Sequence, residues 1–254
     1  MGIFSSKAPK KEQPPFFSVE NFTSLGILVA IIFAIRWSII SPYYVPTASM
    51  EPTIKVGDRL LANKLAYNLK IPFTNIVLAQ WAQVKKGDII VFRFPNDPSI
   101  DYVKRAVAVA GDKIRLVDDI LYINDEPQER ISAGDAQERI LQDIQESQIP
   151  RTLYREKLAG ISHWAMNVEP RSRIYAKGTW PQEGYMTVPE GSVWVIGDNR
   201  DNSFDSRDWG RVPLENIHGK ALVVLWSAYF PEGGWWPIAI RFARFGHLLD
   251  GDLK

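Results

Sequence analysis

The sequence predicts a mainly β protein that follows one apolar N-terminal helix. Short segments rich in Val, Ile, Tyr and Phe recur after residue 43, separated by Gly-Asp, Asn-Asp and Glu-Gly turns. A long apolar stretch precedes them and stops before Pro42. The chain has 254 residues, 46% hydrophobic and 23% charged, which is ordinary for a folded protein with a real core.

Residues 22–40 form the predicted helix, and we interpret them as a transmembrane anchor. A helix of this length would span about 28 Å, close to the hydrocarbon thickness of a bilayer. Arg36 and Trp37 stand near its end, where a long cation and an indole favour the membrane interface. Lysines in the polar tail 1–21 favour a cytoplasmic N-terminus. Two alternatives stay open: a buried core helix, and a cleaved signal peptide with its small residues at Thr47-Ala48-Ser49.

The part of the chain after residue 43 contains several segments that we predict as strands. They are 88–94, 102–109, 113–117, 120–123, 192–196 and 221–226. The region 128–148 is polar and lacks aromatic residues, with helical character at 136–144. We interpret it as an excursion from the β core.

Composition excludes several kinds of site. The chain has no cysteine, so it can hold no disulfide, no thiolate nucleophile and no cysteine-bound metal. His163, His218 and His247 lie far apart and lack the spacing of metal ligands, and we expect no metal and no cofactor. The net charge of +1 gives no indication of nucleic acid as a partner.

The first candidate site is the segment 45–58, which follows the predicted anchor. Pro46 and Pro52 bracket a run of small hydroxyl and methyl side chains that includes Ser49. Proline fixes φ, so this backbone is stiff, and a preorganised hydroxyl is easier to aim at a substrate. A proline-rich linker between helix and domain is the alternative, and the segment taken alone favours it.

The second candidate site is the predicted strand around Lys104. Side chains alternate between the faces of a strand, so Lys104 shares a face with Tyr102 and Ala106. Arg105 shares the other face with Val103, and one of the two cations must lie against a largely apolar surface. Desolvation lowers the pKa of a lysine, and a neutral lysine can act as a general base, whereas arginine cannot. A surface strand with both cations solvated is the alternative.

The third candidate site is the polar loop 197–207, which follows a predicted strand. Its aspartates and asparagines can bond their own backbone and hold tight turns, which predicts an internally bonded scaffold. A calcium loop is the alternative, although the spacing lacks the alternating ligands and closing glutamate of an EF-hand.

These three segments together resemble the bacterial type I signal peptidases, also called leader peptidases. Pro46-Thr-Ala-Ser-Met-Glu-Pro-Thr53 looks like that family's serine box, and Tyr102-Val-Lys-Arg105 with Gly111-Asp112 looks like its lysine box. Gly87-Asp-Ile-Ile-Val-Phe92 and Gly197-Asp-Asn-Arg-Asp-Asn-Ser-Phe-Asp-Ser-Arg207 resemble two further boxes. Each motif alone is weak, but four in this order behind an apolar helix are specific.

The resemblance implies an endopeptidase that removes signal peptides from secreted preproteins after small residues, in the Ala-x-Ala manner. It makes Ser49 the nucleophile and Lys104 the general base. The Ser49 backbone N–H and the Thr47 hydroxyl would hold the oxyanion. Thr47 replaces the commoner serine and keeps the hydroxyl, whereas Ala48 replaces glycine, so a positive φ there would cost energy. The eukaryotic and archaeal branch has histidine in place of the lysine, so Lys104 favours the bacterial branch.

The resemblance also implies residues that support the dyad. Ser203 would hydrogen-bond and orient the lysine, and Asp205 and Arg207 would be structural partners around it. We expect shallow substrate pockets lined by apolar side chains near the dyad. These side chains are Val45, Met50, Ile54, Tyr102 and Val103.

The fold implied by the resemblance is a β catalytic core with a smaller β-rich domain inserted in it. We assign 41–112 and 187–254 to the core and 113–186 to the insert. The protein would be a single-pass protein of the bacterial inner (cytoplasmic) membrane, with its catalytic domain on the outer, periplasmic or extracytoplasmic, face. Its partners would be preproteins and membrane lipid, and it would work near the protein-export translocon.

Two rival functions remain at this point. One is a membrane-tethered binding module that performs no chemistry. The other is a self-cleaving Ser–Lys regulator of the LexA repressor type, which a DNA-binding N-terminal domain would mark. An apolar helix stands in that place here.

The C-terminal segment 233–249 combines aromatic and aliphatic side chains with Arg241 and Arg244. It is too short and too charged to span a bilayer. Trp, Phe and Arg together suit the membrane interface, where guanidinium groups reach lipid phosphates. Packing of these side chains on the β core is the alternative.

Overall fold

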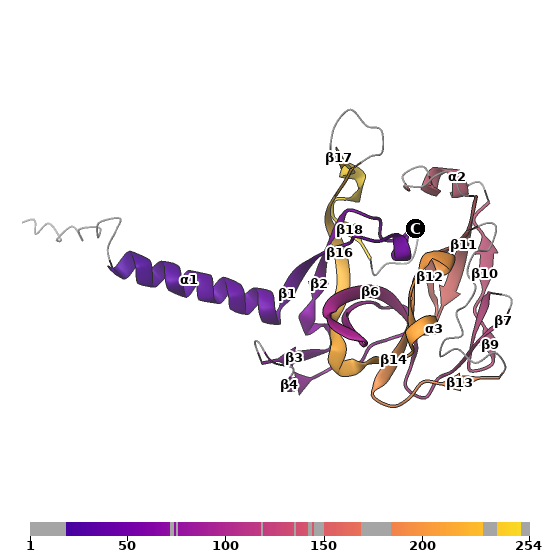
Figure 1. Cartoon of the computed structure of the whole chain (residues 1–254), viewed down its shortest axis with the longest axis horizontal. Coiled ribbons are helices and arrows are strands. Elements are labelled where there is room, and N and C mark those ends of the chain that lie inside the picture. The colour runs from indigo at the N-terminus through magenta and orange to yellow at the C-terminus, as the bar shows by residue number, and fades with distance from the viewer. Residues whose placement is uncertain are drawn as a thin grey trace, which may run out of the picture.

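The computed structural model describes residues 19–71, 74, 76–117, 119–134, 136–141, 144, 150–168, 184–230 and 238–249. One helix projects from the side of a β-rich body, in which strands from distant parts of the chain lie side by side (Figure 1). The predicted mainly β architecture is confirmed.

The projecting helix is α1 (Val19–Ser38), which lies close to the predicted range 22–40. Ile27, Leu28 and Val29 are 57%, 53% and 43% exposed. Successive helical side chains point about 100° apart, so the exposed surface of α1 is apolar on more than one face. The Ser41 hydroxyl donates to the Arg36 carbonyl (2.7 Å) and satisfies one acceptor in the last turn. Among the described residues, no helix combines the length and the apolar character needed to cross a membrane.

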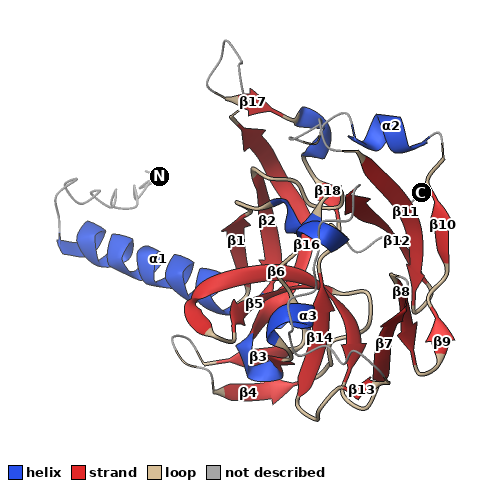
Figure 2. Cartoon of the chain, turned by 45° about the vertical axis from the view of Figure 1, so that its right-hand side comes forward, coloured by secondary structure: helices blue, strands red, loops and turns tan. Residues whose placement is uncertain are grey.

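The main sheet is antiparallel and has the strand order β1-β2-β16-β5-β6-β14-β15. Figure 2 shows these strands, with labels on all but β15. These strands are β1 (Ile40–Tyr44), β2 (Asp58–Asn63), β5 (Ile89–Phe94), β6 (Asp97–Val109), β14 (Ser192–Ile196), β15 (Val212–Pro213) and β16 (Ile217–Tyr229). Two short strands, β17 (Ala239–Ile240) and β18 (His247–Leu248), also pair with β16.

Strand β5 shows how the sequence builds this sheet. Its side chains alternate between two hydrophobic clusters, with Ile89 and Val91 in one and Ile90 and Phe92 in the other. All four are at most 2% exposed. A nearly continuous apolar run is what a strand covered on both faces requires. This buried strand pairs with β6 and so fixes the position of Lys104.

The described strands between residues 113 and 187 form two smaller sheets. One has the order β13-β7-β8-β9, from β7 (Lys113–Val117), β8 (Ile120–Ile123), β9 (Glu126–Pro127) and β13 (Met186–Thr187). The other contains β10 (Arg130–Ser132), β11 (Arg151–Leu158) and β12 (Ile161–Val168). Leu121 and Leu158 pack with Trp194 of β14, so a shared cluster joins both sheets to the main one.

The remaining elements are short. Helix α2 (Ala136–Leu141) lies where the sequence predicts helical character, and α3 (Ser206–Trp209) follows β14. Strands β3 (Asn68–Lys70) and β4 (Val77–Gln80) form a hairpin on the side from which α1 projects (Figures 1 and 2). The 3₁₀ turns are η1 (Ala48–Met50), η2 (Lys64–Ala66), η3 (Arg200–Asn202), η4 (Leu214–Asn216) and η5 (Phe242–Arg244).

The described part of the C-terminal segment holds its two arginines against the β body. Residues 233–237 lie outside the described residues, so the tryptophans of this segment are not placed. Arg241 donates to a backbone carbonyl (2.8 Å), and Arg244 forms an ion pair with Asp58 (2.5 Å). These contacts favour the alternative that both arginines pack on the β core, because acceptors of the body already bind them. Phe242, which lies between them, is 72% exposed.

Candidate active site

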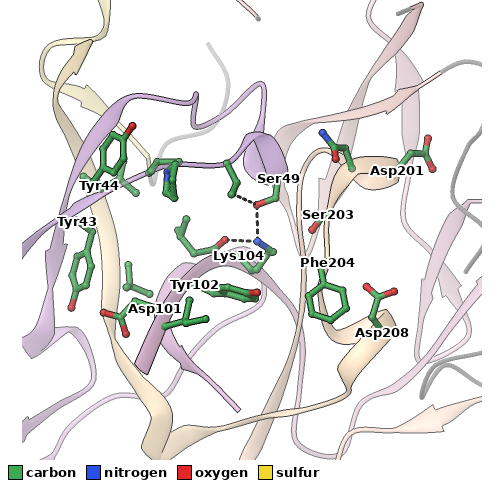
Figure 3. Close-up of a pocket in the computed structure, with 18 residues that line it drawn as sticks. Tyr43, Tyr44, Ser49, Asp101, Tyr102, Lys104, Asp201, Ser203, Phe204 and Asp208 are labelled. Carbon is green, nitrogen blue, oxygen red and sulfur yellow. Dashed lines mark hydrogen bonds between the residues drawn. The ribbon is translucent and has the colours of Figure 1, made fainter. Parts of the chain in front are cut away.

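Ser49 and Lys104 come together from distant parts of the chain. Ser49 lies in η1 and Lys104 in β6. The Lys104 Nζ donates one hydrogen bond to the Ser49 Oγ (2.7 Å) and another to the Val103 carbonyl (3.1 Å), as Figure 3 shows. Ser49 is 7% exposed and Lys104 is 4% exposed. A neutral lysine in this position could accept the Ser49 proton.

The turn that carries Ser49 is held from two sides. Met50 and Ile54 are fully buried in the core beneath it. From the loop 197–207, the Asn199 N–H donates to the Ser49 carbonyl (3.1 Å) and the Asn199 side-chain amide donates to the Ala48 carbonyl (3.1 Å). A nucleophile fixed through its own backbone loses little freedom on the way to the transition state.

Burial sets the protonation of Lys104. Desolvation is the largest cause and lowers the Lys104 pKa from 10.5 to about 8. The carboxylates of Asp205 and Asp198 raise this pKa, and the Arg207 guanidinium lowers it. A lysine with such a pKa has a useful neutral fraction near neutral pH, as a general base needs.

Thr47 precedes η1 in an extended conformation, with φ −126° and ψ 154°. Its Oγ1 lies 3.5 Å from the Ser49 Oγ. A hydroxyl at this distance is close enough to reach an oxygen on the carbon that Ser49 would attack. Ala48 is absent from the described residues with positive φ, so the replacement of glycine there causes no backbone strain.

The predicted scaffold residues form one bonded group. The Ser203 hydroxyl donates to Asp205 Oδ2 (2.7 Å), and the Arg207 Nε donates to Asp205 Oδ1 (2.8 Å). Asp205 also caps α3. Ser203 and Lys104 line the same cavity (Figure 3). Because Ser203 gives its hydrogen to Asp205, its oxygen can act only as an acceptor toward Lys104.

The dyad opens into a cavity of about 670 Å³. Of the predicted pocket residues, Val45, Tyr102 and Val103 line it. Met50 and Ile54 do not, because their side chains point from the Ser49 segment into the core. Six further lining residues were not among the predicted pocket residues. Three of them lie on strands that were not predicted, and the others lie on β5, on β6 and in the loop 197–207: Tyr43, Tyr44, Leu60, Val91, Ile100 and Phe204.

Comparison with known proteins decides the family. A family model described as signal peptidase, peptidase S26, matches residues 18–226. The chain belongs to this signal peptidase family. It is 33% identical, over 91% of its length, to the signal peptidase I of Buchnera aphidicola subsp. Baizongia pistaciae and covers 83% of that relative. It is 34% identical, over 90% of its length, to the signal peptidase I of Pseudomonas fluorescens and covers 78% of that protein.

A crystal structure of a signal peptidase I from Enterococcus faecalis V583 matches 55% of this chain and 97% of that chain, with a TM-score of 0.33 and 25% identity. Membership of the family makes this signal peptidase a serine endopeptidase, and the family mechanism uses a Ser–Lys dyad.

In this signal peptidase both Lys104 and Arg105 are buried. The strand pattern required burial of only one of these two cations. Arg105 is 3% exposed and donates to both oxygens of Asp198, at 2.8 and 2.7 Å. Asp198 also accepts from the Thr53 hydroxyl (2.6 Å), so it connects β6 to the segment that carries Ser49. Arg105 thus binds the carboxylate of Asp198, whose oxygens the calcium alternative would need.

Gly197 is a further site residue, which the sequence indicated only as a turn signal. A Cβ at this position would lie 2.2 Å from the Ser203 Oγ and 2.4 Å from the Ser49 carbonyl oxygen. Only glycine therefore lets the loop pack this closely between the two serines. Its place at the start of the box, directly after β14, is the sequence signal that could have found it.

Proposed function

We propose that Ser49 and Lys104 are the nucleophile and the general base with which this signal peptidase removes signal peptides from secreted preproteins. The family supplies the reaction, because signal peptidases cut preproteins at the end of the signal peptide. The observation that carries the residue assignment is the 2.7 Å hydrogen bond between the Lys104 Nζ and the Ser49 Oγ in a buried site.

The chemistry follows from this contact. Neutral Lys104 takes the Ser49 proton while the Oγ attacks the scissile carbonyl. The Ser49 N–H and the Thr47 hydroxyl hold the oxyanion, and a donor of this kind contributes about 3 kcal/mol. When the C–N bond breaks, the lysine ammonium protonates the leaving amine. The same lysine then takes a proton from a water molecule that attacks the acyl-enzyme. It gives this proton to the Ser49 Oγ when the ester C–O bond breaks, which restores the free serine and the neutral lysine.

The loop 197–207 has a positioning role in this proposal. Ser203 accepts a hydrogen bond from Lys104 as the catalytic pair forms, and Asp205 holds the Ser203 hydroxyl in place. Arg207 neutralises Asp205 in turn. This arrangement keeps the lysine aimed at the serine without placing a carboxylate in direct contact with it, which would raise its pKa further.

The cavity beside the dyad holds the residues that precede the cut. Val45, Leu60 and Val103 give it an apolar wall, and Tyr102 lies beside Lys104. We propose that these walls admit small side chains, in the Ala-x-Ala manner. A series of peptides that differ only in the side chain before the cut tests this point, and equal cleavage after Ala and after Leu would contradict it.

The membrane position is part of the same proposal. Helix α1 anchors the chain with its N-terminus in the cytoplasm and the β body on the outer face of the bacterial inner membrane, near the translocon. Helix α1 as described falls short of the length and apolar character of a complete membrane span. The support for the proposed anchor is its exposed apolar side chains, because a helix that is apolar on several faces requires an apolar environment. Residues 41–112 and 187–254 form the catalytic domain in this proposal, and 113–186 form the insert.

Incubation of the purified full chain with a labelled preprotein tests the function. The full chain should release the signal peptide, and Ser49→Ala should release none. Ser132→Ala, which changes an exposed serine of β10, is the matched control and should cleave normally. Cleavage by Ser49→Ala at the rate of the control would overturn the assignment.

A further inference from the structure

A second cavity, of about 570 Å³, lies where α1 meets the β body. Phe33 and Arg36 of α1 line one side, and Lys70 of β3 lines another. Tyr43 and Asp101 belong to its wall and also to the wall of the active-site cavity. The two cavities are therefore neighbours, and the proposed mechanism makes no use of the second one.

Positive charge dominates the wall of this second cavity. The cationic side chains are Arg36, Lys64, Lys70 and Arg93. Among the described lining residues Asp101 is the only carboxylate, and His218 also contacts it (3.0 Å). The described lining residues therefore carry four cationic side chains and one carboxylate.

Burial and neighbouring charges together set the pKa of two lysines of this cavity. Desolvation is the largest cause that lowers the pKa of Lys64 and of Lys70, and in both cases the Arg93 guanidinium lowers it further. The Lys70 Nζ donates to the backbone carbonyls of Glu215 (3.0 Å) and Ile217 (2.9 Å), which fix its position, and the Glu215 carboxylate raises the Lys70 pKa as the smallest of the causes. An anion in the cavity would relieve the repulsion among these cations.

The surroundings of the cavity are apolar. On one side is α1, whose apolar side chains are exposed. On another is the β3–β4 hairpin, where Ile76, Leu78 and Trp81 are 60%, 60% and 55% exposed. Figures 1 and 2 show both elements on the same side of the body. Cations next to apolar surface at the end of such a helix match the boundary between headgroups and acyl chains.

We propose that this cavity binds the phosphate of an anionic membrane lipid, with the acyl chains of that lipid against α1 and the β3–β4 hairpin. The inference rests on the proposed membrane position of α1. An acidic segment of a preprotein is the alternative anion, and the apolar surroundings favour the lipid. A lipid held here would fix the neighbouring active-site cavity at the membrane surface, where the end of a signal peptide emerges.

Native mass spectrometry of the detergent-solubilised full chain measures this binding. Phosphatidylglycerol is titrated against the full chain and against the double variant Lys64→Gln/Lys70→Gln, with phosphatidylcholine as the neutral lipid. Each lysine beside an anionic lipid contributes about fivefold in affinity, so the double variant should bind phosphatidylglycerol roughly twenty-five times more weakly. Lys113→Gln/Lys157→Gln, which removes two exposed lysines of β7 and β11, should bind as the full chain does.

Three results would overturn the proposal. They are equal affinity of the double variant and the control, equal affinity for the two lipids, and displacement of the lipid by inorganic phosphate or by an acidic peptide at matched concentration. If the double variant unfolds, the single variants Lys64→Gln and Lys70→Gln decide, each with an expected loss of about fivefold. Flotation of the full chain with phosphatidylcholine vesicles tests the anchor separately, and preprotein cleavage by the same preparation tests the dyad.

Discussion

Raising the pH from mildly acidic to alkaline should raise the rate of cleavage through a midpoint near pH 8. Lys104 must lose its proton before it can accept one from Ser49, and burial lowers its pKa from 10.5 to about 8. At pH 7, about a tenth of the molecules would carry a neutral Lys104, against about one in three thousand with an unshifted pKa. The burial therefore supplies a factor of roughly three hundred in available base.

The same burial links activity to stability. The folded-state pKa of Lys104 lies below the unfolded value, so the protonated lysine destabilises the fold at pH values below 8. That destabilisation is relieved as the pH rises from about 8 to 10.5, with an upper limit of about 3 kcal/mol. From this residue alone, activity and the free energy of unfolding should rise over neighbouring pH ranges.

The assay is kcat/KM for a fluorogenic signal-peptide substrate, measured with the full chain in detergent micelles across overlapping buffers. Because kcat/KM reports groups of the free enzyme, its midpoint measures the Lys104 pKa without bound substrate. Ser49→Ala supplies the background rate at each pH. A midpoint near pH 10.5, or a rate that does not change with pH, would refute the reasoning that Lys104 is a desolvated base.

Three further changes have outcomes that follow from the structure. Thr47→Val deletes a hydroxyl 3.5 Å from the Ser49 Oγ and should lower kcat roughly a hundredfold with little change in KM; an unchanged kcat would assign the oxyanion to another donor. Gly197→Ala would place a Cβ 2.2 Å from the Ser203 Oγ and should lower kcat about a hundredfold. Gly26→Ala, with no atom within 4 Å of the new Cβ, is the control and should leave kcat unchanged. Equal kcat values for the two variants would contradict the packing argument. Burial raises the Glu51 pKa to about 7, so the charged carboxylate destabilises the fold above that pH. Glu51→Gln should therefore raise the free energy of unfolding at pH 8, by up to about 3 kcal/mol, but not at pH 4. Denaturant titrations at both pH values check this, and an equal effect at both would be inconsistent with it.

Strand periodicity was enough to predict the position of Lys104 on its strand, but not the ion pairs that surround it. The alternation in 102–109 predicts that Lys104 and Arg105 face opposite ways, and both are buried. The alternation could not show that Arg105 pairs with Asp198, because the partner lies 93 residues further along the chain. A buried arginine needs a carboxylate, but several aspartates could supply one, and only the fold selects among them.

The residues that line the substrate cavity were predicted less well from the sequence, for a different reason. Met50 and Ile54 lie close to Ser49 in sequence, yet they point into the core because η1 turns the chain there. Tyr43 and Leu60 line the cavity from β1 and β2, which the sequence did not predict as strands. Both strands are short, and the apolar pattern of β1 is interrupted by a proline, so periodicity is weak in them. The paired strands β11 and β12 were missed as well.

The central claim is that Ser49 and Lys104 act as one catalytic unit. A double-mutant cycle tests it most directly, with single-turnover cleavage of a labelled preprotein by the full chain, Ser49→Ala, Lys104→Met and the double variant. Circular dichroism of each variant checks that the fold is retained. Each single change should abolish cleavage to the level of the double variant, because neither residue works without the other. Near-normal turnover by Lys104→Met, or losses that multiply in the double variant, would contradict it.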